Sequence, residues 1–177
     1  LRWEAQIVAL SSLVLVAAYP FMKRITWWPQ AWLGLVFSWG APTGWFAVTG
    51  HFSATLGWLY AGCIAWVIGY DTIYALQDRE DDALVGVRSS ALRLGSNVKP
   101  GVALFYTAAL ICWGMAVWSV RPQTLALMTL LPVTLHLCWQ VVTLRPDDGG
   151  DALAKFRSNR FAGGLMAAAC LLVGTTA

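Results

Sequence analysis

The chain has 177 residues, of which 58% are hydrophobic and only 12% are charged, and it contains 11 tryptophans. A soluble domain carries about twice this fraction of charge, and a disordered chain needs low hydrophobicity with high net charge, so the composition excludes both classes. A net charge of +3 supplies no basic field for nucleic acid. The composition is typical of a polytopic membrane protein in contact with lipid. At about 20 residues per crossing plus short loops, the length accommodates about six transmembrane helices.

Six apolar segments follow one another along the chain, separated by short polar or charged breaks. They comprise residues 5–22, 31–48, 52–76, 98–120, 125–144 and 161–177. Irregular backbone inside a bilayer leaves polar groups unpaired, so segments of this length are expected to be helices. The sequence therefore predicts an all-α fold, a polytopic membrane bundle with six transmembrane helices.

Positive charge is distributed unequally between the two ends of this predicted bundle. If the six segments alternate in direction, only Arg2 and Arg121 of the 12 lysines and arginines lie on one side, and the remaining ten lie on the other. Cytoplasmic loops carry an excess of lysine and arginine, so the side with ten is expected to be cytoplasmic. The acid-rich stretch 78–82 lies on that same side.

Three aspartates mark the cytoplasmic end of the third segment. Asp71 still lies within apolar sequence, where an ionisable side chain is expensive and is a candidate functional group. If the helix continues past the membrane surface at about 100° per residue, Asp71, Asp78 and Asp82 share one stripe. Such a stripe is repulsive unless a cation neutralises it. Magnesium suits this arrangement because it prefers one or two carboxylates together with substrate phosphates.

Two cationic residues, Lys23 and Arg24, end the first segment on the same side. A lysine acts as a point charge and an arginine as a bidentate fork, so the pair can clamp a diphosphate. Beside an acid-bound metal, they would stabilise a departing diphosphate. Basic residues at a helix end also serve as topology anchors, and an acidic loop is often only a solvated face. Neither of these readings explains the alignment of Asp71 with Asp78 and Asp82.

Helix caps are predicted at two further positions. Ser89 or Ser90 is expected to cap a short cytoplasmic helix that ends near Gly95. Ser158 or Asn159 is expected to cap the last transmembrane segment in the same way. The four cysteines lie far apart in apolar runs, so their spacing indicates neither a zinc site nor a disulfide framework.

Three stretches of the chain resemble motifs of the UbiA superfamily of intramembrane prenyltransferases. Residues 70–95 resemble the second aspartate-rich motif of that family, and residues 19–30 are similar to its tyrosine–lysine segment. Residues 158–163 are similar to the start of its last helix. The similarity extends over essentially the whole chain, in the same order. It is strongest to the 4-hydroxybenzoate polyprenyltransferases of ubiquinone synthesis.

The resemblance implies a nine-helix bundle with a central cavity and a cytoplasmic cap. There, a polyprenyl diphosphate ionises with the help of Mg2+, and the allylic cation attacks 4-hydroxybenzoate ortho to its hydroxyl. Matching positions imply roles for six residues: Asp78 and Asp82 as metal ligands, Asp71 as a deeper catalytic carboxylate, and Tyr19, Lys23 and Arg24 in substrate binding.

One family motif has no counterpart in this chain. The first aspartate motif, N-D-x-x-D-x-x-x-D, does not occur, so the six segments correspond to the last six of nine helices. We therefore expect residues 1–177 to form a partial UbiA-type domain that lacks the first three helices and is inactive alone.

Three alternatives stay open at the level of sequence. The aromatic acceptor could belong to menaquinone, haem or chlorophyll synthesis rather than to ubiquinone synthesis. The chain could instead be a transporter-like membrane protein with an acidic cytoplasmic mouth. A bacterial inner membrane is the expected location, with a mitochondrial membrane as the alternative. The sequence carries no signal of oligomeric state.

Overall fold

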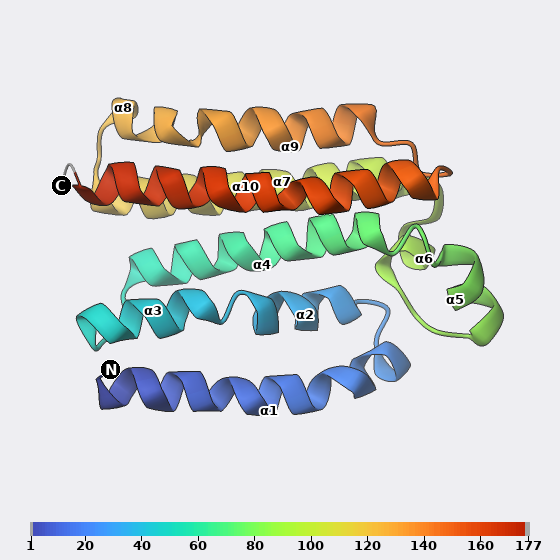
Figure 1. The fold of residues 1–177 in the computed structure, drawn as a ribbon, viewed down its shortest axis with the longest axis horizontal. Coiled ribbons are helices and arrows are strands. Elements are labelled where there is room, and N and C mark those ends of the chain that lie inside the picture. The colour runs from blue at the N-terminus through green and yellow to red at the C-terminus, as the bar shows by residue number, and fades with distance from the viewer. Residues whose placement is uncertain (1, 176–177) are drawn as a thin grey trace.

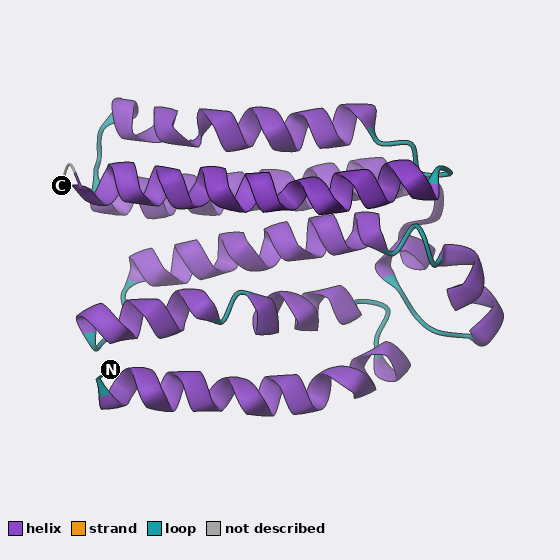
Figure 2. Ribbon diagram, viewed as in Figure 1, coloured by secondary structure: helices purple, strands orange, loops and turns teal. Residues whose placement is uncertain are grey.

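A computed structural model describes residues 2–175, apart from the side chains of Lys23, Glu80 and Thr175. Every regular element among these residues is a helix (Figures 1 and 2), which confirms the all-α prediction. In chain order the elements are α1 (Trp3–Ile25), α2 (Pro29–Phe37), α3 (Gly40–Thr49), α4 (Ala54–Tyr74), α5 (Arg79–Val85), α6 (Ser90–Leu94), η1 (Gly95–Asn97), α7 (Val98–Val120), α8 (Thr124–Leu127), η2 (Met128–Leu130), α9 (Leu131–Thr143) and α10 (Gly149–Thr175).

The long helices lie side by side along the long axis of the molecule (Figure 1). The end of α1, the small helices α5 and α6, and the turn between α9 and α10 all lie at one end, as the charge pattern predicts. Four helical stretches are long and apolar enough to cross a membrane: Trp3–Met22, Ala54–Tyr74, Ser90–Val120 and Thr124–Thr143. The chain is therefore a multi-pass membrane protein, and the count of six crossings stays a prediction.

The second predicted segment is not one helix but two. Helix α2 ends at Phe37 and α3 begins at Gly40, with Ser38 and Trp39 between them. Pro42 explains the break, because proline has no N–H to donate to the carbonyl four residues earlier and is tolerated only in the first turn of a helix. Residues 31–48 therefore run in one general direction along the bundle as a broken helix (Figure 1).

The third predicted helix also ends earlier than expected. Helix α4 stops at Tyr74, and the backbone N–H groups of Ala75 and Leu76 donate to the carbonyls of Asp71 and Ile73 at 2.9 and 3.2 Å. These bonds tighten and close the helix end. The prediction that one continuous helix carries Asp71, Asp78 and Asp82 is therefore wrong.

The two cap predictions had different outcomes. The Ser89 hydroxyl accepts from the backbone N–H of Leu92 at 3.3 Å, and α6 ends at Leu94, directly before Gly95, which confirms the first of them. The second is wrong, because Ser158 and Asn159 lie in the middle of α10.

Helix α4 packs most extensively against α7, through glycines that face aromatic rings. Gly62 lies against Trp113 and Gly69 lies against Tyr106, so that a Cβ atom at either glycine would overlap the ring. Both rings are buried, at 0% and 2% exposure. The two pairs are each seven residues apart, so they lie on one face of each helix. Close approach through small residues is how membrane helices gain packing energy where lipid removes the hydrophobic driving force.

A chain of polar side chains joins four helices inside the bundle. The Tyr106 hydroxyl of α7 donates to Gln140 Oε1 of α9 at 2.6 Å, and Gln140 Nε2 donates to the Ser158 hydroxyl of α10 at 2.9 Å. The indole N–H of Trp66 on α4 donates to Asn159 Oδ1 at 2.9 Å. Ser158 and Asn159 thus connect helices instead of capping one, and such contacts contribute about 0.6 kcal/mol each on average in membrane proteins.

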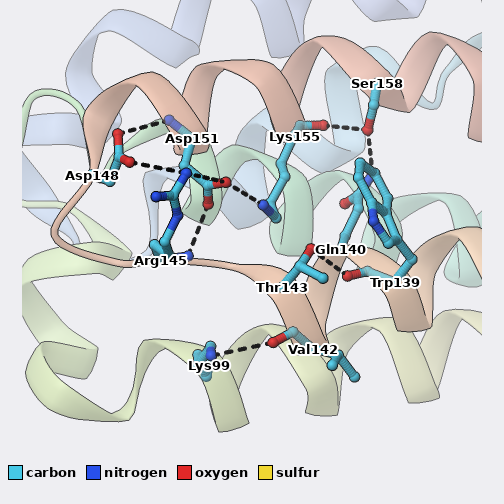
Figure 3. Close-up of polar contacts among 10 residues, drawn as sticks. All are labelled: Lys99, Trp139, Gln140, Val142, Thr143, Arg145, Asp148, Asp151, Lys155 and Ser158. Atoms are coloured by element: carbon cyan, nitrogen blue, oxygen red, sulfur yellow. Dashed lines mark hydrogen bonds and ion pairs between the residues drawn. The ribbon is translucent and has the colours of Figure 1, made fainter.

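A buried ion pair fixes the turn between α9 and α10. Asp151 lies between Arg145 and Lys155 (Figure 3) and bonds to Lys155, whose side chain is only 4% exposed. It also accepts from the Arg145 backbone N–H at 2.8 Å. Burial alone would raise the pKa of Asp151, but the hydrogen bonds from Lys155 and Arg145, together with their charges, lower it below its ordinary value.

Replacing Gly62 with alanine should destabilise the bundle, because the new methyl group would overlap the Trp113 ring. We expect a loss of about 1–3 kcal/mol, the range for overpacking a core. Thermal unfolding in detergent measures it. Gly114→Ala on α7 is the matched control, since nothing lies within 4 Å of the added carbon. Equal melting temperatures for wild type and Gly62→Ala would contradict this packing.

Asp151→Asn should destabilise the protein at neutral pH by about 3–5 kcal/mol, because it leaves the buried Lys155 charge uncompensated. The pKa of Asp151 is lowered in the folded state, so its contribution is complete above the ordinary carboxyl pKa of about 3.9. The contribution is then lost as the pH falls through the folded-state pKa.

The melting temperatures of wild type and Asp151→Asn should therefore converge in acid. Asp147→Asn is the control, because Asp147 forms an ion pair with Arg79 while its side chain is 88% exposed, and exposed pairs contribute about 0–1 kcal/mol. A difference between wild type and Asp151→Asn that is independent of pH would count against the buried pair.

Candidate functional site

A small cavity lies at the charged end of the bundle, where α1, α2, α4 and α5 meet. Its volume is about 60 Å3, and its polar lining comes from Tyr19, Gln30, Asp71, Tyr74, Asp78, Asp82 and Ser89. About 10–15 Å3 of such space is enough to admit one water molecule, so the cavity has room for a few waters or for one group of a larger ligand. We call it the acid cavity.

Helix α4 delivers Asp71 to the acid cavity from its last turn. The preceding residue, Tyr70, packs against Phe156 of α10 with ring centroids 5.7 Å apart. The following residues, Thr72 and Ile73, are fully buried. Because successive helical residues turn by about 100°, Asp71 projects from a different face of α4 than Tyr70, into the cavity shared with α1 and α2.

The bend after α4 brings the other two aspartates back to the same cavity. Asp78 is the residue that precedes α5, and Asp82 lies one turn later, with its backbone N–H donating to the Asp78 carbonyl at 2.7 Å. One turn of α5 therefore holds both carboxylates over the end of α4. The shared location that a single helix was expected to provide is instead produced by a helix, a turn and a second short helix.

Contacts on two sides fasten the α5–α6 segment over the bundle. Arg79 pairs with Asp147 in the α9–α10 turn at 3.3 Å. On the other side, Arg88 donates to the Ile25 carbonyl at the end of α1 at 2.8 Å, and its guanidinium lies 5.4 Å from the centre of the Trp27 ring. These two arginines are engaged with neighbouring turns, and neither lines the acid cavity.

The carboxylates of the acid cavity are hard oxygen donors of the kind that magnesium prefers. Within the described part of the chain, no group of three histidine, cysteine, aspartate or glutamate side chains is arranged to hold a metal by itself. Magnesium usually takes only one or two carboxylates and completes its shell with water and substrate phosphates. Asp78 and Asp82 therefore fit as a partial ligand set that needs further oxygens.

The structure brings together four of the six predicted site residues, namely Tyr19, Asp71, Asp78 and Asp82. Arg24 is exposed at the end of α1 and is not part of the cavity lining. Lys23 lies in the last turns of α1, and its side chain is outside the described residues. Asp78 and Asp82 both line the cavity, which is the arrangement that the metal–diphosphate interpretation requires.

Sequence reasoning missed Gln30 and Ser89 as lining residues. A signal for Gln30 was present, because Pro29 occupies the first position of α2, where proline is favoured. A helix that starts there places Gln30 in its first turn, next to the end of α1.

The chain is similar in sequence to several curated proteins. A 4-hydroxybenzoate polyprenyltransferase, mitochondrial, of Caenorhabditis elegans is 43% identical over 167 residues, which are 92% of this chain and 46% of that protein. The human protein of the same description is 41% identical over 167 residues, 92% of this chain and 44% of that protein. A 4-hydroxybenzoate octaprenyltransferase of Coxiella burnetii is 35% identical over 156 residues, 88% of this chain and 54% of that protein.

The chain spans about half the length of these curated relatives. No solved structure gives a significant match. The profile of the UbiA prenyltransferase family matches residues 1–173, nearly the whole chain. The acid cavity is thus built from the two stretches whose motifs carry the resemblance, and the chain belongs to the UbiA prenyltransferase family.

Proposed function

We propose that the protein containing this chain transfers a polyprenyl group from an allylic polyprenyl diphosphate to the ring of 4-hydroxybenzoate, ortho to the hydroxyl, in ubiquinone biosynthesis. The observation that carries the proposal is the convergence of Asp71, Asp78 and Asp82 with Tyr19 on one cavity at the charged end of a membrane bundle. We take 4-hydroxybenzoate as the acceptor substrate because the names of the relatives contain it.

The reaction breaks the bond between the allylic carbon and the diphosphate oxygen, and the leaving diphosphate keeps the electron pair. A new carbon–carbon bond then forms to the ring, and the ring carbon loses its proton. Magnesium, when bound, neutralises the charge that develops on the diphosphate. Asp78 and Asp82 would hold it, and Lys23 and Arg24 would bind the diphosphate from the end of α1.

Asp71 lies deeper than the other two carboxylates, on the last turn of α4. We assign it the role of stabilising the positive charge on the acceptor ring or of taking the proton that the attacked ring carbon loses, since a positioned carboxylate can act as a general base. Tyr19 on α1 lines the same cavity, and its hydroxyl would hydrogen-bond to the substrate.

The cavity lies at the end of the bundle where positive charge is concentrated. The positive-inside rule therefore supports a cytoplasmic opening in a bacterial inner membrane. The mitochondrial descriptions of several relatives apply to those proteins. Membership of the UbiA family favours prenyl transfer over a transporter-like function, and the convergence of the carboxylates on one cavity supports the same choice.

In the full-length protein, Asp78→Ala and Asp82→Ala should each reduce magnesium-dependent prenylation at least about a hundredfold, because each removes a group that stabilises charge in the transition state. Mass spectrometry of membrane extracts supplied with 4-hydroxybenzoate would detect the 3-polyprenyl-4-hydroxybenzoate product. Asp81→Ala is the matched control, since Asp81 is exposed on the same helix and does not line the acid cavity. Full turnover in both cavity variants would refute the assigned roles.

Residues 1–177 expressed alone should insert into membranes but form no product. The described residues offer no three-ligand metal group, so we propose that the remaining ligands come from a part of the protein outside this chain. The same extracts and mass spectrometry check this expectation. Product formed by the isolated chain would show that these residues suffice.

A further inference from the structure

Gln30 is a buried residue that lines the acid cavity. Its side-chain oxygen accepts a hydrogen bond, whereas its side-chain nitrogen donates none within the described residues. Its side chain is only 4% exposed, and its Oε1 accepts from the backbone N–H of Ser90 at 3.2 Å. A backbone N–H can only donate, so the atom that faces Ser90 has to be the amide oxygen. The amide nitrogen is therefore on the opposite side of the group.

A second contact joins Ser90, the partner of this amide, to α4. The Ser90 hydroxyl lies 2.7 Å from the Thr72 hydroxyl, which in turn donates to the Ile68 carbonyl of α4 at 2.6 Å. Ser90 and Thr72 are both fully buried. Gln30 thus joins α2 to the first residue of α6, and the contact between Ser90 and Thr72 joins α6 to α4.

The amide nitrogen of Gln30 forms no hydrogen bond within the described part of the chain, although Gln30 lines the acid cavity. It is also not among the polar atoms of that part that are sealed from solvent without a partner, which belong to Ser38, Trp45 and Trp113. The nitrogen, on the side of the amide away from Ser90, is the polar atom that Gln30 can offer to the cavity. An amide donor that is open to a cavity can give its hydrogen bond to a ligand oxygen there.

The negative charge of the cavity explains why an amide, and not a cationic side chain, would donate a hydrogen bond to an anionic ligand here. Asp71, Asp78 and Asp82 line the same space, and a cationic side chain among them would be drawn into ion pairs. A neutral amide can donate to an anion without being neutralised by the carboxylates, and it adds no charge that would displace a metal ion.

We propose that Gln30 is a substrate-binding residue whose amide N–H donates to an anionic oxygen of the ligand in the acid cavity. This inference rests on the proposed function for the identity of the ligand. The oxygen belongs either to the diphosphate of the prenyl donor or to the carboxylate of the aromatic acceptor.

Three variants of the full-length protein separate binding from folding. Gln30→Glu keeps an oxygen for the Ser90 N–H but loses the donor, and Gln30→Met loses both. Thr72→Val is the matched control, because it breaks the contact with Ser90 and leaves the Gln30 amide intact. Isothermal titration calorimetry in detergent measures the affinity of each variant for inorganic pyrophosphate with Mg2+ and for 4-hydroxybenzoate, and thermal unfolding reports stability.

Both Gln30 variants should lose about tenfold or more in affinity for one of the two probes, the effect of one hydrogen bond to a charged group. Loss for pyrophosphate identifies the diphosphate as the partner, and loss for 4-hydroxybenzoate identifies the carboxylate. Thr72→Val should lower the melting temperature and leave both affinities unchanged.

Unchanged affinity of both Gln30 variants for both probes, or binding of neither probe to the wild type, overturns the proposal. Product formation by the wild type is measured in parallel. Its absence would refute the proposed function, whereas binding that depends on Gln30 would still support this inference.

Discussion

Helix α4 packs against α2, α3, α7 and α10, and the positions of the other helices depend on these contacts. Gly62 and Gly69 allow it to lie directly against Trp113 and Tyr106 of α7, in a setting where packing rather than the exclusion of water holds helices together. Once this contact is made, the rotation of α4 is set. Asp71 then has to project toward α1 and α2, into the acid cavity, because it lies on a different side of the helix from the face that meets α7.

Polar side chains within the bundle are used mainly to join helices. The Tyr106–Gln140–Ser158 chain and the Trp66–Asn159 bond link α7, α9, α10 and α4. Unpaired polar groups are costly inside a bilayer, so each of these side chains has a defined partner. The buried Asp151–Lys155 pair does the same for the α9–α10 turn at the bundle end. The three aspartates and Tyr19 instead line one shared space, the acid cavity.

Much of the fold follows from local patterns in the sequence. Apolar segments of sufficient length predict membrane helices, and the charged breaks predict the end at which the loops gather. The structure has helices in all six segments, but residues 31–48 are broken near Pro42 and residues 125–144 are divided among α8, η2 and α9. The last two residues of the sixth segment, 176–177, lie outside the described residues. The error at the end of α4 has a definite cause. Asp71, Asp78 and Asp82 lie on one face only if the helix continues past Tyr74. The hydrogen bonds from Ala75 and Leu76 instead close α4 at that residue.

The sequence by itself determined the fold class, the end of the bundle at which charged residues gather, and the choice of Asp71, Asp78 and Asp82 as candidate site residues. Hydrophobic length, charge and motif spacing are properties of neighbouring residues, so they can be recognised without the fold. Only the tertiary structure decided that Asp71, Asp78 and Asp82 meet by way of a turn, and that Gln30 and Ser89 line the same cavity. The contact between Gln30 and Ser90 joins residues sixty positions apart. No local pattern encodes such a contact, since it depends on how α2, α4 and α6 pack once the helices have assembled.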